Sequence, residues 1–223
     1  DELAESGEYL FAVGIHDENI GYALAEFANQ YDNIAVIYNL DPLTSLIESA
    51  FEDKYEGNLI IAEGYTFETT DFRTPLLKVE DADAIVVIGF DETGFIFKQM
   101  KQLGMTQTKI AMDTVTSEAF LANAGEAAEG IYFSSWDATG DDYQALAKRM
   151  SRTPDQPLFT AAGYDAMMFV AKAMSTGTNL HNSMYTTQMQ GVTGELTMSP
   201  DGIVRTVSEE MYQVQNGKFV KLS

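Results

Sequence analysis

The 223-residue chain carries 13 basic and 34 acidic side chains, giving a formal net charge of −21 at pH 7, and 45% of its residues are hydrophobic. This hydrophobic content can supply a buried core, so we expect a folded protein. The negative charge repels phosphate backbones and anionic membrane surfaces and excludes nucleic acid as a partner. The chain has no cysteine, which excludes disulfides, thiolate nucleophiles and thiolate metal sites.

In the first 133 residues, short apolar runs rich in β-forming residues alternate with stretches of helical periodicity. The predicted strands are Tyr9–Val13, Ile34–Tyr38, Leu59–Ala62, Ile85–Ile88 and Ile131–Phe133. The predicted helices are Asn19–Tyr31, Pro42–Tyr55, Phe72–Val79 and Thr93–Leu103. This alternation predicts an α/β fold built on a doubly wound parallel sheet.

The pattern changes after Ser135. Two helices are predicted in succession, Asp142–Met150 and Phe159–Ser175, with Pro154 and Pro157 breaking the helical pattern between them. A second structural unit is therefore expected to begin there.

The end of the chain is predicted to form antiparallel strands. Asp201-Gly202 and Asn216-Gly217 are dipeptides typical of hairpin turns, and they flank the apolar runs Glu209–Val214 and Phe219–Leu222. No apolar run approaches the roughly 20 residues that a membrane-spanning helix needs. The first nine residues are acidic and polar and contain no apolar signal core.

Patterns typical of enzymes and of nucleotide or metal sites are weak. Neither of the two histidines, His16 and His181, accompanies a G-x-S-x-G elbow, which disfavours a Ser/His/Asp hydrolase. No glycine-rich phosphate loop is present. The acidic stretch Asp137–Asp142 lacks the spacing of a calcium loop. We therefore expect no metal and no cofactor.

Single carboxylates at strand ends are more informative. Asp91 and Asp113 each follow a hydrophobic strand, where open α/β sheets bind their ligands. Each could instead cap a helix. The same pair is the only one worth testing as a catalytic base in a flavodoxin-like enzyme.

Four groups of residues resemble one known protein family in their order and spacing. The first is Tyr9-Leu10-Phe11 with His16-Asp17 and Gly21, and the second is Gly64-Tyr65-Thr66 with Asp71-Phe72 and Leu76-Leu77. The third is Lys98-Gln99 with Leu103-Gly104, Gly125 and Ala128-Glu129-Gly130-Ile131. The fourth is Gly163-Tyr164-Asp165-Ala166, Gly191-Val192-Thr193-Gly194 and Ser199-Pro200-Asp201-Gly202. Together they resemble the leucine-binding type of type I periplasmic binding protein, the substrate-binding family of amino-acid ABC transporters.

The resemblance implies two α/β lobes around a ligand cleft. Residues 14–130 with 190–223 would form the second lobe, and residues 1–13 with 131–189 would form the hinge and a remnant of the first lobe. The family's opening segment has no counterpart in this chain, so we expect an incomplete first lobe. The family also implies an exported protein, periplasmic or extracellular, without its signal peptide.

The resemblance also implies a set of ligand-binding residues. Asp113 matches the acidic residue that pairs with the ligand's amino group. Phe90 matches an aromatic wall, and Asp91 is its neighbour. Leu43 stands where several relatives have tyrosine, which leaves the ligand open. The remaining expected residues are Leu158 or Phe159, which match an apolar position of the first lobe, and Trp136, which either lines the cleft or fills the hinge.

The function expected from the resemblance is binding of an amino acid without catalysis, followed by delivery to an ABC permease. A ligand-sensing domain of a receptor or regulator is the main alternative. The helix Phe159–Ser175 has an apolar face that the incomplete lobe is expected to leave uncovered. We expect a second copy of the chain (self-association), a separately encoded first lobe, or disorder at this face. The residues of that face are Ala162, Ala166, Phe169, Val170 and Ala173.

Overall fold

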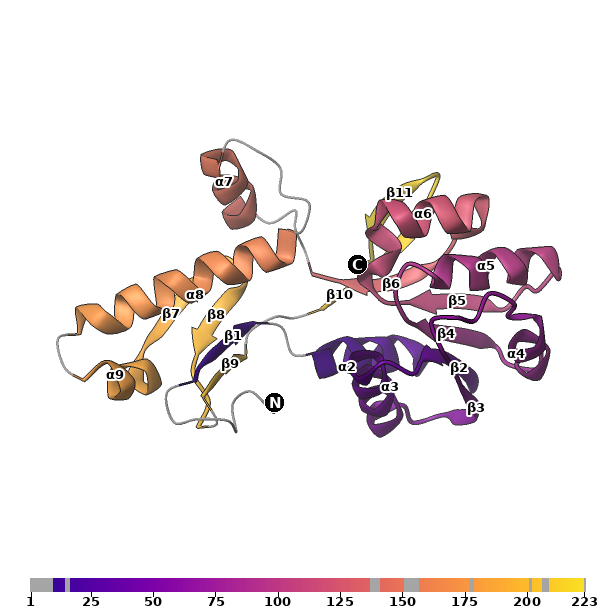
Figure 1. Cartoon of the computed structure of the whole chain (residues 1–223), viewed down its shortest axis with the longest axis horizontal. Coiled ribbons are helices and arrows are strands. Elements are labelled where there is room, and N and C mark those ends of the chain that lie inside the picture. The colour runs from indigo at the N-terminus through magenta and orange to yellow at the C-terminus, as the bar shows by residue number, and fades with distance from the viewer. Residues whose placement is uncertain are drawn as a thin grey trace. The chain divides into compact units, whose positions relative to one another are not determined.

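The computed structural model describes residues 10–14, 17–136, 141–150, 157–176, 179–200, 202–205 and 209–222. The chain divides into two compact units, and each unit contains two separate chain segments (Figure 1). Unit 1 consists of residues 1–16 and 136–208. Unit 2 consists of residues 17–135 and 209–223.

Unit 2 is built on a sheet of seven strands in the described part of the chain, in the order β11-β10-β6-β5-β4-β2-β3. The strands β2 to β6 are parallel to one another, whereas β10 pairs antiparallel with both β6 and β11. The bounds are β2 Asn33–Asn39, β3 Asn58–Tyr65, β4 Ala84–Ile88, β5 Thr108–Ala111, β6 Tyr132–Ser135, β10 Glu210–Gln215 and β11 Lys218–Lys221.

Helices cover both faces of this sheet, because alternate residues of its central strands are apolar on opposite sides. On β2, Ile34 and Val36 belong to one core cluster, whereas Ala35 and Ile37 belong to the other. The helical elements of unit 2 are α2 Asp17–Ala28, α3 Pro42–Lys54, α4 Arg73–Lys78, α5 Thr93–Gln102, η1 Asp113–Thr116, α6 Glu118–Ala124 and η2 Gly125–Ala128. The predicted doubly wound α/β fold is confirmed.

Two local details follow directly from the sequence. The pair Asn216 and Gly217 has positive φ at both residues, 53° and 68°, which joins β10 to β11 in the hairpin expected from Asn-Gly. In α2, Gly21 lies so close to α3 that a Cβ atom there would be 2.3 Å from the carbonyl oxygen of Ile47. The glycine is therefore required for these two helices to pack together.

Unit 1 contains two short strand pairs and three helices among its described residues. The strand β1 (Ala12–Gly14) is parallel to β9 (Ile203–Arg205), and β7 (Gln188–Gly191) forms an antiparallel hairpin with β8 (Gly194–Thr197). The helices are α7 Asp141–Met150, α8 Pro157–Ser175 and α9 Leu180–Thr186. No helix in the described residues has the combined length and apolarity to cross a membrane.

The core of unit 1 corrects two expectations. Phe169 and Ala173 of α8 are buried against Leu196 and Val204, which come from β8 and β9. Residues 190–208 thus belong with α8 and not with the second-lobe sheet, to which only the strands after Glu209 contribute. The α8 face that was expected to be bare is likewise covered by these strands.

A third correction concerns the segment expected to form part of the hinge. Residues 132–135 are the strand β6, which lies between β5 and β10 in the sheet of unit 2. Phe133 of this strand is buried in the core of unit 2, which explains its placement there.

Candidate functional site

The candidate site lies where the parallel strands of unit 2 end. Strands β2, β3, β4 and β5 run in the same direction, so their carboxyl ends meet at one edge of the sheet. Loops after parallel strands at this edge commonly form ligand sites in open α/β folds. The residues that follow these strands are therefore the candidate site residues.

Glu92 connects three of these strand ends. Its Oε1 atom accepts hydrogen bonds from Nδ2 of Asn39 at 2.8 Å, from the hydroxyl of Tyr65 at 2.9 Å and from the backbone N–H of Phe90 at 3.3 Å. Burial and the negative charge of Glu92 raise the pKa of Tyr65 above its ordinary value, so the phenol stays protonated and donates. Neither Glu92 nor Asn39 was predicted from the sequence.

Asp91 forms a connection between the β4 loop and α6. Its Oδ1 atom accepts a hydrogen bond from the hydroxyl of Ser117, and its carbonyl oxygen accepts one from Nδ2 of Asn123 at 2.9 Å. Ser117 is the N-cap of α6 and accepts from the backbone N–H of Phe120 at 3.0 Å. These bonds give the Asp91 carboxylate a role in positioning the helix.

Asp113 follows β5 and is the first residue of η1. Burial, with a smaller contribution from the negative charge of Asp17, raises the pKa of its carboxyl group to about 6, against backbone hydrogen bonds that lower it. At pH 7 most Asp113 side chains are ionised. No described lysine, arginine or histidine forms an ion pair with Asp113.

Phe90, in the loop after β4, packs against a second aromatic ring. Its ring centroid is 5.5 Å from that of Phe67, with an interplanar angle of 26°. Phe67 lies in the loop after β3, and 56% of its surface is exposed. Thr114, next to Asp113, donates a hydrogen bond to the carbonyl oxygen of Gly89 at 3.1 Å. The aromatic pair and Asp113 therefore lie along one edge of the sheet.

The sequence as a whole was compared with protein families. A family model described as periplasmic binding protein matches residues 2–218. The chain belongs to the periplasmic binding protein family. This family comprises solute-binding proteins and not enzymes. Among curated protein sequences, none matches the chain.

Solved structures share the fold of this binding protein. LivJ from Streptococcus pneumoniae in complex with isoleucine has a TM-score of 0.80 and 24% identity, with 100% of this chain and 70% of LivJ covered. The leucine-binding protein LivK from Thermotoga maritima has a TM-score of 0.79 and 21% identity, with 99% and 69% covered. A solute-binding protein from R. palustris in complex with benzoate has a TM-score of 0.78 and 16% identity, with 99% and 66% covered.

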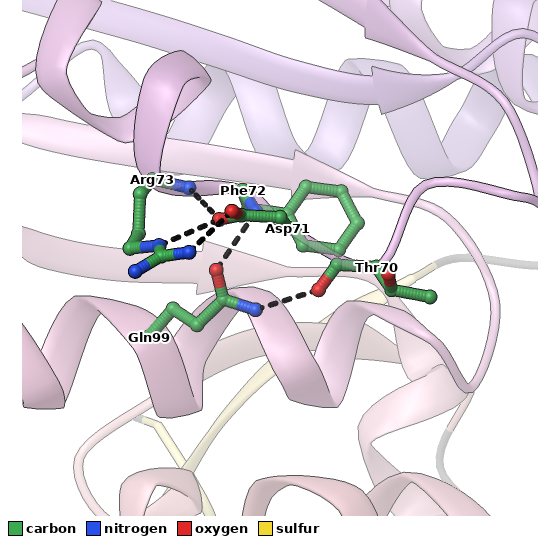
Figure 2. Close-up of polar contacts among 5 residues, drawn as sticks. All are labelled: Thr70, Asp71, Phe72, Arg73 and Gln99. Atoms are coloured by element: carbon green, nitrogen blue, oxygen red, sulfur yellow. Dashed lines mark hydrogen bonds and ion pairs between the residues drawn. The ribbon is translucent and has the colours of Figure 1, made fainter.

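Two of the stretches that carried the family resemblance contact each other in the binding protein (Figure 2). Oε1 of Gln99, on α5, accepts a hydrogen bond from the backbone N–H of Phe72 at 2.7 Å, and Nε2 of Gln99 donates to the carbonyl oxygen of Thr70 at 2.9 Å. Asp71 and Arg73 form an exposed ion pair at 2.5 Å in the same turn. These residues fix the loop between β3 and α4 and therefore have a structural role.

The other predicted site residues divide between the two units. Leu43 is half-buried in the first turn of α3, two residues after the helix cap Asp41, which lies in the loop after β2. In unit 1, the ring of Trp136 packs edge-on against Tyr143 at 5.3 Å, and Phe159 of α8 is 67% exposed. Leu158 belongs to α8, but its side chain lies outside the described residues.

The structure thus brings Asp113, Phe90 and Asp91 to one edge of unit 2, with Leu43 at the end of the neighbouring strand β2. Phe67 was missed by the sequence reasoning, although its position in the loop after the predicted strand Leu59–Ala62 was a usable signal. Among the residues described, no group of three or more His, Asp or Glu side chains could hold a metal ion.

Proposed function

We propose that this chain binds a small amine-bearing ligand, an amino acid, and that Asp113 accepts the hydrogen bond from its ammonium group. The observation that carries the proposal is the Asp113 carboxylate, which is partly buried at the carboxyl edge of the sheet and lacks a cationic partner among the described residues. An ammonium group supplies the missing positive charge. Such a charge-assisted hydrogen bond is stronger than one between neutral groups.

The neighbouring aromatic pair suits the rest of such a ligand. Phe67 and Phe90 present apolar surface at the same edge of the sheet as Asp113, and burying apolar surface stabilises a complex by about 25 cal/mol per Å². The ligands named for two of the similar structures fit this chemistry. LivJ holds isoleucine and LivK is a leucine-binding protein, and both amino acids combine an ammonium group with an apolar side chain.

The physiological role that follows is uptake of the ligand by an ABC transporter. In this role the protein is exported, periplasmic or extracellular, and its macromolecular partner is the permease that receives the ligand. The family match supports this proposal, as do the branched-chain amino-acid transporter components among the similar structures.

The proposal is tested by titrating the chain with L-leucine, using calorimetry for tight binding and NMR shifts for weak binding. Asp113→Asn removes the negative charge but keeps the shape of the side chain. We expect it to weaken binding by about 1.5 to 3 kcal/mol. Asp81→Asn is the matched control, because Asp81 is exposed and precedes β4, at the opposite edge of the sheet.

Circular dichroism establishes that both variants are folded. Equal affinities of Asp113→Asn and Asp81→Asn would remove Asp113 from the site. If the chain bound neither leucine nor any other amino acid in a panel of the twenty, the proposed function would be wrong.

A further inference from the structure

A second carboxylate, Glu209, lies at the same edge of unit 2 as Asp113. Glu209 directly precedes β10, whose first residue Glu210 pairs with Ser135 at the end of β6. Strand β6 in turn pairs with β5, with Phe133 opposite Ala111. Because Ser135 and Asp113 each lie two residues beyond that pair, Asp113 and Glu209 are about two strand spacings apart, on the order of 10 Å between backbones.

The Glu209 side chain has an unused hydrogen-bonding atom. Its Oε2 atom is buried and accepts no hydrogen bond from the described residues. Buried carboxylate oxygens in folded proteins are normally hydrogen-bonded, because losing contact with water without a replacement is costly. A ligand that donates a hydrogen bond to Oε2 would satisfy this atom.

The surroundings of the two carboxylates are negative. Burial and the charge of Asp113 raise the pKa of Glu209 to about 8, and Asp17, in the first turn of α2, acts on Asp113 in the same direction. Neither Asp113 nor Glu209 has an ion pair with a described lysine or arginine. At pH 7 Glu209 is therefore mostly protonated, and positive charge from a ligand would favour its ionised form.

We propose that Asp113 and Glu209 together bind a ligand with two ammonium groups, so that the site prefers an amino acid with a basic side chain over an apolar one of the same length. The inference rests on the proposed function, in which Asp113 binds the first ammonium. Glu209 then determines specificity by accepting a hydrogen bond from the second. L-lysine has this chemistry, because its two ammonium groups are separated by a flexible chain that, together with the two acidic side chains, can bridge the ends of β5 and β10 across β6.

The test compares L-lysine with L-norleucine, which has the same carbon chain without the terminal ammonium. We expect the unmodified chain to bind lysine at least about tenfold more tightly than norleucine. Glu209→Gln should reduce lysine affinity about tenfold and leave norleucine affinity unchanged. The control is Glu210→Gln, since Glu210 is adjacent but is already paired with Lys221 at 3.4 Å, and it should change neither affinity.

A second measurement needs no variant. A bound ammonium group favours the ionised form of Glu209, so lysine should release more protons at pH 7.5 than norleucine does. Calorimetry in phosphate and in Tris, which differ in ionisation enthalpy, measures this release.

The outcomes separate the two proposals. Norleucine binding that weakens in Asp113→Asn, combined with no preference for lysine and no extra proton release, would overturn the role of Glu209 and leave the proposed function intact. Absence of binding by both lysine and norleucine would overturn the role of Glu209, and absence of binding by all twenty amino acids would overturn the proposed function as well. If Glu209→Gln still bound lysine more tightly than norleucine, the second ammonium group would be bound by another residue, and this result would also contradict the inference.

Discussion

Asp165 on α8 holds Thr193, in the turn between β7 and β8, by two hydrogen bonds. The backbone N–H and the hydroxyl of Thr193 both donate to Oδ2 of Asp165 at 2.7 Å, while the N–H of Val192 donates to Oδ1 at 2.8 Å. Asp165 is fully buried. A Cβ atom on Gly191 would lie 2.6 Å from Oδ2, so the carboxylate can approach the turn only at glycine. These contacts join two of the stretches that resemble the family.

The first prediction is that Asp165→Ala destabilises unit 1. The substitution removes the acceptor of three donors, two of them on the buried Thr193, and we expect a loss of about 2 to 4 kcal/mol in the free energy of unfolding. The fluorescence of Trp136, the only tryptophan, reports on unit 1 during a urea titration. Glu195→Gln, at an exposed position of the same hairpin, should be close to neutral. If Asp165→Ala and Glu195→Gln unfolded at the same urea concentration, the hydrogen bonds of Asp165 would contribute little to stability.

The second prediction concerns pH and begins from Glu48 on α3. Burial and a hydrogen bond with Glu52 raise the pKa of Glu48 to about 7. A carboxyl group with a raised pKa binds its proton more tightly in the folded state than in the unfolded state. Its contribution to stability therefore falls as pH rises from about 4.5, its ordinary pKa, to about 7. Asp113 and Glu209, with raised pKa values of about 6 and about 8, act in the same direction.

Glu48→Gln isolates the first of these effects. The neutral amide avoids burying a charge, so at pH 8 the variant should melt a few degrees above the unmodified chain, and the difference should shrink at pH 5. Glu56→Gln, on an exposed residue after α3, is the control for a change in net charge. Circular dichroism recorded during heating at pH 8 and at pH 5 measures the melting temperatures of the two variants and of the unmodified chain. A Glu48→Gln variant that is less stable at pH 8 would contradict the prediction.

The alternation of apolar strands and amphipathic helices was sufficient to predict the sheet of unit 2. Runs such as Ile34–Tyr38 and Ile85–Ile88 are buried on both faces, as central parallel strands are, and their composition shows this directly. The short strands of residues 188–205 gave no comparable signal. Their sheet partners are set by contacts with α8, for example between Leu196 and Phe169, and local sequence does not contain that information.

Only part of the candidate site could be predicted from the sequence. Asp113 could be placed at the carboxyl edge because it follows an apolar run and matches a family position. Glu92 and Glu209 could not be singled out among 34 acidic residues. Glu92 is distinguished only by the hydrogen bonds that it accepts from residues of β2 and β3. Glu209 is distinguished only by the strand pairing that brings β10 beside β6. Both relationships depend on the tertiary fold.

The third prediction is self-association through the outer side of α8. The inner side of this helix is covered, but Phe159, Met167 and Met174 on the helix are 67%, 71% and 63% exposed. At spacings of eight and seven residues, these side chains recur after about two helical turns and form an apolar stripe. Apolar stripes on soluble proteins commonly mark interfaces, and we expect the occupant to be a second copy of the chain.

Sedimentation velocity over a hundredfold range of concentration should show the weight-average sedimentation coefficient rising with concentration. The double variant Met167→Lys with Met174→Lys places like charges on the stripe, and it should sediment as a monomer throughout. Leu46→Lys with Leu77→Lys is the matched control, because these leucines are exposed in unit 2, and it should associate like the unmodified chain. Because both double variants change the net charge by the same amount, a general charge effect would appear in each. If the unmodified chain remained monomeric across the range, the stripe on α8 would not be a self-association surface.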